Sequence, residues 1–330
     1  MGALKNIYPH ANTVVCIEES KLLKKINYDI LHNAAGLAPT LNELNEINYF
    51  QSHHPASPDN YGAMLDRLMK ITLELLKNIA PVADIWRIFA LYYDIHNMKL
   101  VVKERFFGKR FDELALDYGS YSMATIRSAA VRKKDDILSN EVLTEGFFEA
   151  LHLKDSYDID FILDKLYFRT LKHMAIKLKT PAIDGFITEK IDLFNVSLVL
   201  QAISAGIPEG YFQRAFSEGG SCSLDEWQLY LKKDKPDELT HFPLWQKYRP
   251  IWSAARNRNQ ALAEVDVWID DYLIEKTKTC KLMAFGIEPI CAYFFNKIME
   301  IKNVRILLEG KARNYSQPEI RKRMRIPYEV

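Results

Sequence analysis

The sequence predicts an all-α protein, and three kinds of observation support that prediction. Apolar residues recur at three- and four-residue steps in several long segments. The chain shows no convincing series of alternating strands separated by Asn-Gly or Asp-Gly turns. A Ser or Thr followed three positions later by Glu marks a helix start, because the two side chains satisfy each other's backbone donors. Such pairs stand at Thr40–Glu43, Ser223–Glu226 and Ser316–Glu319.

Three segments carry the clearest apolar stripes, and each predicts a long amphipathic helix. In chain order they cover residues 64–79, 161–178 and 263–278. Their stripes are formed by Met64, Leu65, Leu68, Ile71, Leu75 and Leu76, then by Ile162, Leu163, Leu166, Leu171 and Met174, then by Val267, Leu273 and Ile274. One apolar face per helix indicates that the helices bury these faces against one another.

The composition is that of a water-soluble globular protein. Hydrophobic residues make up 48% and charged residues 26% of 330 residues, and the formal net charge is +1. That balance excludes a disordered chain, and it gives no overall field that would attract a polyanion. The most apolar stretch, residues 281–299, contains Glu288-Pro289 and is flanked by Lys281 and Lys297. A bilayer span needs about 20 nearly uninterrupted apolar residues, so we expect no direct membrane insertion.

A nine-residue motif occurs three times. It combines an acidic residue, an Asn three positions later and a run of apolar residues, and it stands at DIHNMKLVV, DLFNVSLVL and EIKNVRILL. Its polar members are Asp94 and Asn97, Asp192 and Asn195, and Glu300 and Asn303. Residue frequencies predict on the order of 0.1 chance matches, so three matches indicate an internal repeat.

Other residues recur at similar distances from the motif in each copy. Asp66 and Asp164 each precede the Asn of their copy by 31 positions, and Asp270-Asp271 lies at nearly the same offset before Asn303. A proline falls between in each copy, at Pro81, Pro181 and Pro289, and a Ser-led helix start follows the motif at Ser122, Ser223 and Ser316. We therefore expect three related helical lobes of about 100 residues each.

The lobes divide the chain into residues 61–158, 159–263 and 264–330. Only about 60 residues follow Asp271, so the third copy is short. Because a repeat needs neighbours to bury its apolar face, we expect the segment 1–60 to complete the third lobe.

Two interpretations of the repeated polar pair stay open. On a helix the acidic residue and the Asn lie on one face, one turn apart. Both side chains favour bonds to backbone groups, so they can tie the helix to an adjoining connection. Alternatively, three related positions present polar groups to a central partner.

Candidate catalytic, cofactor and metal sites have little support. No phosphate-binding glycine loop, nucleophile elbow or C-x-x-C pair occurs. His53-His54 stands beside Pro55 without a matching carboxylate spacing, so it predicts a surface loop. The basic C-terminal cluster of Arg321, Lys322, Arg323 and Arg325 lacks interleaved aromatics, which favours a cationic helix end over nucleic-acid binding. We expect no catalytic residue, no cofactor, no metal and no nucleic acid.

Taken together, these motifs resemble the C-subunit family of V-type/A-type ATP synthases (AC39-like), whose eukaryotic counterpart is the d-subunit of the V-ATPase. The resemblance covers most of the chain. It is clearest over Leu65–Val102 and over the tail from Glu300 to Tyr328, and it extends to the opening Tyr8-Pro-His-Ala-Asn. The chain lacks the arginines that the family pattern has near Val14 and Val15.

The resemblance implies a pseudo-threefold funnel of helical lobes and a non-catalytic component of the central stalk. Such a protein couples the central shaft, made by subunits D and F, to the membrane rotor ring during ATP-linked transport of protons or sodium ions. It would be cytoplasmic and peripheral, held at the inner face of the membrane by the ring. We expect the six motif residues to be a structural signature of the repeat. An interface with a partner is their alternative role.

Two rival functions stay open from the residues alone. One is a helical scaffold that binds other proteins in a concave face, unrelated to rotary ATPases. The other is an all-helical enzyme that uses Asp94 and His96 as an acid/base pair. Residues two positions apart on a helix point about 200° apart around its axis, which disfavours the enzyme.

Overall fold

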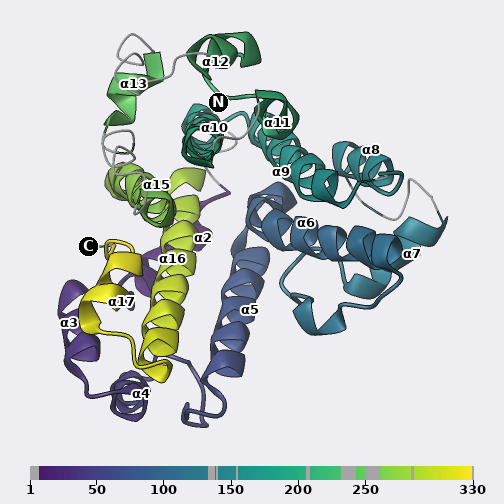
Figure 1. Ribbon diagram of the computed structural model, residues 1–330. Helices are drawn as coiled ribbons and strands as arrows, with labels where there is room; N and C mark the ends of the chain where they lie inside the picture. The colour runs from purple at the N-terminus through teal and green to yellow at the C-terminus, as the bar shows by residue number, and fades with distance from the viewer. Residues whose placement is uncertain are drawn as a thin grey trace. The chain divides into compact units, whose positions relative to one another are not determined.

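The structure is a computed structural model, and it describes residues 7–132, 138, 140–153, 155–205, 209–231, 243–249, 251, 261–283 and 286–328. Within these residues the chain forms helices and turns and no strand, which confirms the predicted all-α class (Figure 1). The α-helices are α2 (Pro9–Glu19), α3 (Lys25–Asn33), α4 (Leu37–Glu46), α5 (Tyr61–Ile79), α6 (Ala83–Phe107), α7 (Met123–Arg132), α8 (Glu141–Ala150), α9 (Ser156–Leu178), α10 (Pro181–Ala205), α11 (Glu209–Ala215), α12 (Leu224–Leu231), α13 (Pro243–Lys247), α15 (Ala261–Thr277), α16 (Ile287–Ala312) and α17 (Gln317–Arg323). Short 3-10 turns occur at η1 (Asp112–Leu114) and η3 (Lys278–Leu282).

The chain divides into two compact units. Unit 1 comprises residues 1–85 and 266–330, and unit 2 comprises residues 86–265. The boundaries fall inside α6 and α15. The three-lobe division expected from the repeats remains a prediction, because a division into two units neither requires nor excludes it.

Unit 1 is built around α16. This helix packs against α2, α4, α5, η3 and α17, and α3 packs against α4. Figure 1 shows α5 and α17 beside α16. Most of α16 is buried, as expected of a helix surrounded by others. The N-terminal helices therefore share a core with the C-terminal part of the chain.

Lys311 holds the end of α3 against α16. Its ammonium group donates to the carbonyl oxygens of His32 (3.0 Å) and Ala34 (2.5 Å). Carbonyls at a helix C-terminus lack intrahelical partners and attract cations, so this is a favourable position for a lysine. Burial lowers the pKa of Lys311.

Unit 2 is built around α9 and α10. Helix α9 packs against α8, α10 and α11, and α11 packs against α12. Phe212 of α11 and Trp227 of α12 are fully buried, with ring centroids 6.2 Å apart. In the same unit, Arg127 of α7 is paired with Glu104 near the end of α6 (2.5 Å), which fixes α7 to that end.

The predicted apolar stripes fall on helices α5, α9 and α15, and the buried face of α5 is shifted from its predicted stripe. On α5, Leu65, Leu68 and Leu76 are buried, whereas Met64, Ile71 and Leu75 are only half-buried. Met69 and Leu73 complete the buried face and were not in the predicted stripe. The buried face of α5 is therefore rotated around the helix axis toward Met69 and Leu73, relative to the predicted stripe.

The prolines of the three copies lie at or near the start of the long motif-bearing helices. Pro181 is the first residue of α10, Pro289 is the third residue of α16, and Pro81 lies two residues before α6. Proline suits the first turn of a helix, because its missing N–H would have no intrahelical partner there. Glu288-Pro289 therefore starts a helix.

Two of the three predicted capping boxes are confirmed. Ser316 and Glu319 bond reciprocally at the start of α17, and Ser223 and Glu226 do so at α12. The predicted box at Thr40–Glu43 is wrong, because α4 begins three residues earlier. Thr40 is buried inside that helix, and its hydroxyl donates to the carbonyl of Gly36 (2.8 Å). The hydroxyl of Thr40 therefore bonds within the first turn of α4 and does not cap a helix start.

None of the helices in the described ranges is both long enough and apolar enough to cross a bilayer.

Gly310 gives a test of the packing of α17 on α16. A Cβ added at Gly310 would come within 2.6 Å of Cγ1 of the buried Ile320, whereas a Cβ at Gly185 of α10 meets nothing within 4 Å. Gly310→Ala should lower the free energy of unfolding by about 1–3 kcal/mol through overpacking. Gly185→Ala should raise it by up to about 1 kcal/mol, through the better helix propensity of Ala. Urea unfolding of the two variants measures both effects, and equal effects would contradict the close packing.

Candidate functional site

The six residues of the repeated motif lie inside helices and are buried. Asp94 and Asn97 are on α6, Asp192 and Asn195 on α10, and Glu300 and Asn303 on α16. None of the six is more than 5% exposed. This burial requires each polar group to find a partner within the fold.

Each asparagine binds both backbone groups of one later residue. Asn97 donates to the carbonyl of Leu116 (2.7 Å) and accepts from its N–H (3.0 Å). Asn195 makes the same pair of bonds with Ser217 (2.9 and 3.0 Å), and Asn303 makes it with Arg325 (3.0 and 2.8 Å). The three partners lie 19, 22 and 22 residues further along the chain. In each case the amide replaces the backbone partner that an irregular segment lacks.

In unit 2 the acidic residue binds the same connection a few residues later. Asp94 accepts from the N–H of Tyr121 (3.0 Å). Asp192 accepts from the N–H and the hydroxyl of Ser221 (2.6 and 2.7 Å). Each motif helix is therefore joined at two points to the connection that follows it, and we name each such arrangement a polar junction.

A glycine lies against the carboxylate in both junctions of unit 2. A Cβ at Gly220 would stand 2.5 Å from Oδ1 of Asp192, and one at Gly119 would overlap Oδ1 of Asp94. The backbone approaches the carboxylate too closely for any other residue. Sequence reasoning missed these glycines. Their signal is a glycine one or two residues before the Ser or Tyr whose N–H the carboxylate binds.

The third junction, in unit 1, uses different partners for its acidic residue. Glu300 accepts from the N–H of Leu23 and from the ammonium group of Lys297 (both 2.5 Å). The connection after α16 is bound instead by Asp271 of α15, which accepts from the N–H of Ile326 (2.8 Å). Helix α17 also precedes the residue bound by Asn303, whereas α7 and α12 follow theirs. Glu300 therefore joins α16 to the N-terminal segment.

Lys297 is another residue whose place sequence reasoning missed. The sequence suggested a charge flanking an apolar stretch, but the side chain is buried on α16 beside Glu300. It also lies over the ring of Tyr49, 5.0 Å from the centroid. A buried cation needs such partners, and here a carboxylate and an aromatic face supply them.

Ion pairs link the first helix of one copy to the motif helix of another. In unit 2, Asp164 of α9 binds Lys99 of α6 (2.8 Å). In unit 1, Asp66 of α5 binds Arg305 of α16 (2.6 Å). Lys99 and Arg305 both stand two residues after the motif Asn, and Asp66 and Asp164 are the landmarks found 31 residues before it. The second copy thus contacts the first, and the first contacts the third. In both cases the Asp that lies 31 residues before the Asn of its own copy binds the cation two residues after the Asn of the other copy.

In the third copy, the corresponding Asp270 binds residues of its own copy. Asp270 binds Lys302 of α16 (2.7 Å) and the buried Arg325 (2.8 Å). Arg325 was counted in the basic C-terminal cluster, but it belongs to the third junction and is not a surface cation. The surface part of that cluster is Arg321, Lys322 and Arg323.

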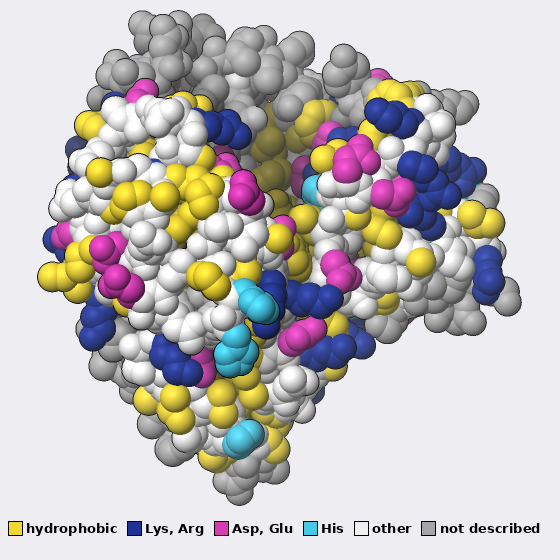
Figure 2. All heavy atoms as spheres, turned by 90° about the horizontal axis from the view of Figure 1, so that it is seen from below, with side chains coloured by type: hydrophobic (Ala, Val, Ile, Leu, Met, Phe, Trp, Pro, Cys, Tyr) yellow, Lys and Arg dark blue, Asp and Glu magenta, His cyan; other side chains and the backbone are white. Residues whose placement is uncertain are grey.

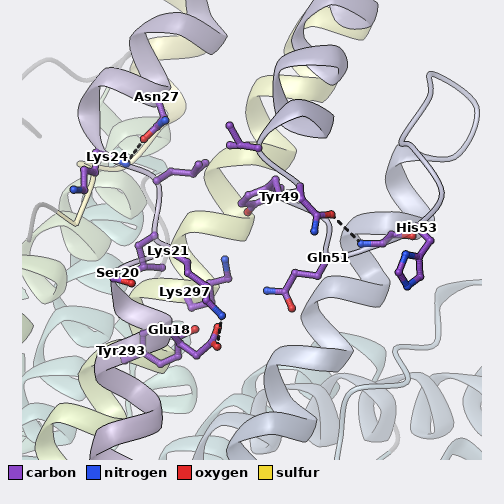
Figure 3. A pocket seen from close by; sticks show the side chains of 15 residues that line it. Glu18, Ser20, Lys21, Lys24, Asn27, Tyr49, Gln51, His53, Tyr293 and Lys297 are labelled. Carbon is purple, nitrogen blue, oxygen red and sulfur yellow. Dashed lines mark hydrogen bonds and ion pairs between the residues drawn. The ribbon is translucent and has the colours of Figure 1, made fainter.

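A cleft of about 660 Å³ opens beside the third junction in unit 1. Its wall includes Lys297 and Tyr49 from the buried cluster. Figure 3 shows Gln51 directed across the cleft toward Lys21 and Lys297. Lys21 is paired with Glu18 (2.5 Å) and Lys297 with Glu300, so both ammonium groups already have an anionic partner. The cleft is therefore polar, and the charges of Lys21 and Lys297 are balanced within the fold.

Asp94 has an unusual proton affinity for a carboxyl group. Burial raises the pKa of Asp94 to about 7, although the bonds from Tyr121 and Ser120 act in the opposite direction. The neighbouring His96 points elsewhere and bonds the carbonyl of Leu114 (2.9 Å). The two side chains therefore do not converge on a reacting atom. The raised pKa of Asp94 is therefore a consequence of its burial in the junction.

The described residues contain no cluster of candidate metal ligands, and the charges on the face drawn in Figure 2 are mixed in sign. No group of three His, Cys, Asp or Glu side chains with metal-binding geometry occurs among the described residues. His53 and His54 lie in an exposed turn. Figure 2 shows acidic and basic side chains interspersed over the face that it draws, with apolar side chains scattered between them.

Comparison with known proteins identifies the family. Residues 11–323 match the ATP synthase (C/AC39) subunit family. The chain belongs to this family.

Relatives of similar length support this assignment. The chain is 23% identical to the C-subunit of the V-type sodium ATPase of Enterococcus hirae over 98% of this chain and 99% of that protein. It is 21% identical to the C-subunit of the A-type ATP synthase of Methanocaldococcus jannaschii over 95% of this chain and 85% of that protein. The corresponding A-type protein of Methanococcoides burtonii is 23% identical over 81% of this chain and 78% of its own length. The predicted family is confirmed, and the chain is a non-catalytic subunit of a rotary ATPase complex.

The asparagine bonds can be tested by their effect on stability. Asn195→Ala should lower the free energy of unfolding by about 2–4 kcal/mol, because it leaves the buried N–H and carbonyl of Ser217 unpaired. Asn42→Ala, at an exposed position on α4, should change it by less than about 0.5 kcal/mol. Urea unfolding measures both. If the two substitutions proved equally mild, the junction would contribute nothing to stability.

The raised pKa of Asp94 predicts a pH dependence. Because the folded-state pKa is about 7 and the ordinary value is 3.8, the protonated carboxyl is favoured by folding. Its contribution to stability is complete below the ordinary value and is lost as the pH rises through the folded-state value. Between about pH 4.5 and 6.5, this group should lower the free energy of unfolding by about 1.4 kcal/mol per pH unit.

Asp94→Asn should remove this contribution, since the amide oxygen still accepts from Tyr121 but does not titrate. Asp29→Asn, on the exposed part of α3, should keep the wild-type slope. Urea unfolding at a series of pH values compares the three proteins. An unchanged slope in Asp94→Asn would show that this carboxyl titrates in its ordinary range.

Proposed function

We propose that this chain is the central-stalk component that couples the shaft formed by subunits D and F to the membrane rotor ring of a V/A-type ATPase. In this role it carries rotation between ATP chemistry and the transport of protons or sodium ions. The observation that carries the proposal is the match of nearly the whole chain to the ATP synthase (C/AC39) subunit family, with relatives that it covers almost end to end.

The physical task fits the chain. A slender helical shaft must turn a much broader ring, so an adaptor has to bridge the two diameters without yielding. Packed helices with directional polar bonds at their connections resist distortion better than apolar packing alone, because hydrogen bonds have preferred distances and angles. The buried junctions at Asn97, Asn195 and Asn303 give such rigidity, and no catalytic group is needed.

Two contacts between copies follow one pattern, which supports a head-to-tail order of the lobes. The first helix of copy two contacts the motif helix of copy one, and the first helix of copy one contacts the motif helix of copy three. We propose that the lobes encircle an axis on which the shaft stands.

The proposed location follows from these partners. The chain is peripheral at the inner, cytoplasmic face of the membrane and is held there by the rotor ring.

Binding experiments with the two partners test the proposal. The full chain, immobilised on beads, should capture the D–F shaft pair and, in a separate experiment, the detergent-solubilised rotor ring. The chain alone should hydrolyse no ATP above a bead blank. Asn42→Ala, which changes an exposed position on α4, is the matched control and should capture both partners as the wild type does.

Each partner reports on one half of the proposal. Loss of ring binding alone would remove the adaptor role, and loss of shaft binding alone would remove the axial role. Capture of neither partner by a folded chain would discard the rotor assignment in favour of a general helical scaffold.

A further inference from the structure

His32 lies where the end of α3 meets α16 and α17, in unit 1 (Figure 1). Its backbone carbonyl accepts from the ammonium group of Lys311 on α16 (3.0 Å) and from the side-chain amide of Gln317 on α17 (2.9 Å). Beside these bonds, Asp29 of α3 faces Arg321 of α17, with 3.8 Å between their charged groups. We name these five residues the α3 joint.

The imidazole ring of His32 is buried in the α3 joint, and only 5% of the residue is exposed. Its Nδ1 atom is buried and has no hydrogen-bond partner among the described residues. A neutral imidazole tolerates this position, because one of its ring nitrogens carries no proton and Nδ1 can be that nitrogen. An imidazolium ion carries a proton on both nitrogens, so it would leave a buried N–H donor unpaired. The packing of the joint therefore favours the neutral ring.

The charges around the ring also oppose its protonation. Two cations face His32, Lys311 from α16 and Arg321 from α17, whereas the one anion that faces it is Asp29 of α3. The side chains of Asp29 and Arg321 are both about half exposed, so water screens this anion, and Arg321 shares it. Burial, and after it the two cations, hold the pKa of His32 below its ordinary value of 6.5.

We propose that the α3 joint is an acid-sensitive switch, in which protonation of His32 separates the end of α3 from α16 and α17. A charged ring beside Lys311 and Arg321 combines like-charge repulsion with an unpaired donor, and exposure of the ring to water relieves both. The start of α3 stays attached, because the N–H of Leu23 just before it is bound by Glu300. The opening is therefore local to the end of the helix.

The switch goes beyond the proposed adaptor role and does not depend on it, since the isolated chain suffices to show it. Other buried carboxyls respond to acid in the opposite direction. Burial raises the pKa of Asp94 to about 7 and that of Asp271 to about 6, so protonation of these two groups stabilises the folded chain. Acid would thus strengthen their junctions and weaken the α3 joint, and only a local measurement separates the two effects.

Hydrogen exchange at the end of α3 measures the opening. The amides of residues 30–34 are followed between pH 7.5 and 5.5, with the intrinsic exchange rate corrected at each pH. Their opening constant should rise as the pH falls below about 6.5, by up to about 10-fold per pH unit, because one proton is bound on opening. The amides of α9, in unit 2, should show no such rise.

Two histidine variants assign the response. His32→Gln should abolish the rise in the opening constant, because the amide does not titrate. The slope with pH decides this test, so a change in the overall stability of the variant does not obscure it. His10→Gln makes the same substitution at an exposed position on α2 and should keep the wild-type slope.

Two variants of α17 test the role of the charges. NMR titration of the ring protons should give a midpoint for His32 below pH 6.5 in the wild type. Arg321→Gln removes a cation that faces the ring, so it should move this midpoint to higher pH. Lys322→Gln removes the neighbouring exposed cation, which is not among the groups that act on His32, and should leave the midpoint unchanged.

Four results would overturn the proposal. They are an opening constant of α3 that does not rise with acid, the same rise in His32→Gln as in the wild type, titration of His32 at or above pH 6.5, or equal midpoints in the two α17 variants.

Discussion

The most consequential interaction in this protein is the double hydrogen bond from a buried asparagine to one backbone N–H and carbonyl. A helix in a globular core normally excludes polar side chains from its packed face, because an unpaired buried amide costs about 1–3 kcal/mol. Here the backbone N–H and carbonyl of the irregular connection next to the helix also lack backbone partners. Asn97, Asn195 and Asn303 meet both needs at once. The connection is thereby held at a defined point on the helix.

The same bonds explain which features the sequence could predict. Helices and their buried faces follow from apolar spacing. The motif was recognisable as a repeat because each copy keeps an Asn whose loss would leave a backbone N–H and carbonyl unpaired. Caps at Ser223 and Ser316 were predictable because their partners lie three residues away. Thr40 carried the same local signal, but Gly36 starts its helix one turn earlier.

Features that depend on distant partners could not be predicted in this way. Gly119 and Gly220 are required by a carboxylate that lies 25 and 28 residues before them in the chain. The burial of Lys297 depends on Tyr49, and the bond of Glu300 depends on Leu23, which is 277 residues away. A single sequence records the spacing within a helix, but it does not record which distant segment a helix meets.

The third junction shows how one motif adapts to a different neighbour. In unit 2 the acidic residue is Asp, and its target lies in the connection that the Asn also binds. In unit 1 the acidic residue is Glu, and its target is the backbone of the N-terminal segment. The extra methylene of Glu lengthens its reach, and Lys297 balances the charge that the backbone N–H alone leaves unpaired. Asp271 then takes over the bond to the following connection. The substitution of Glu for Asp is therefore tied to the chain's ends sharing one core, because only at this junction does the segment bound by the carboxylate come from the opposite end of the chain.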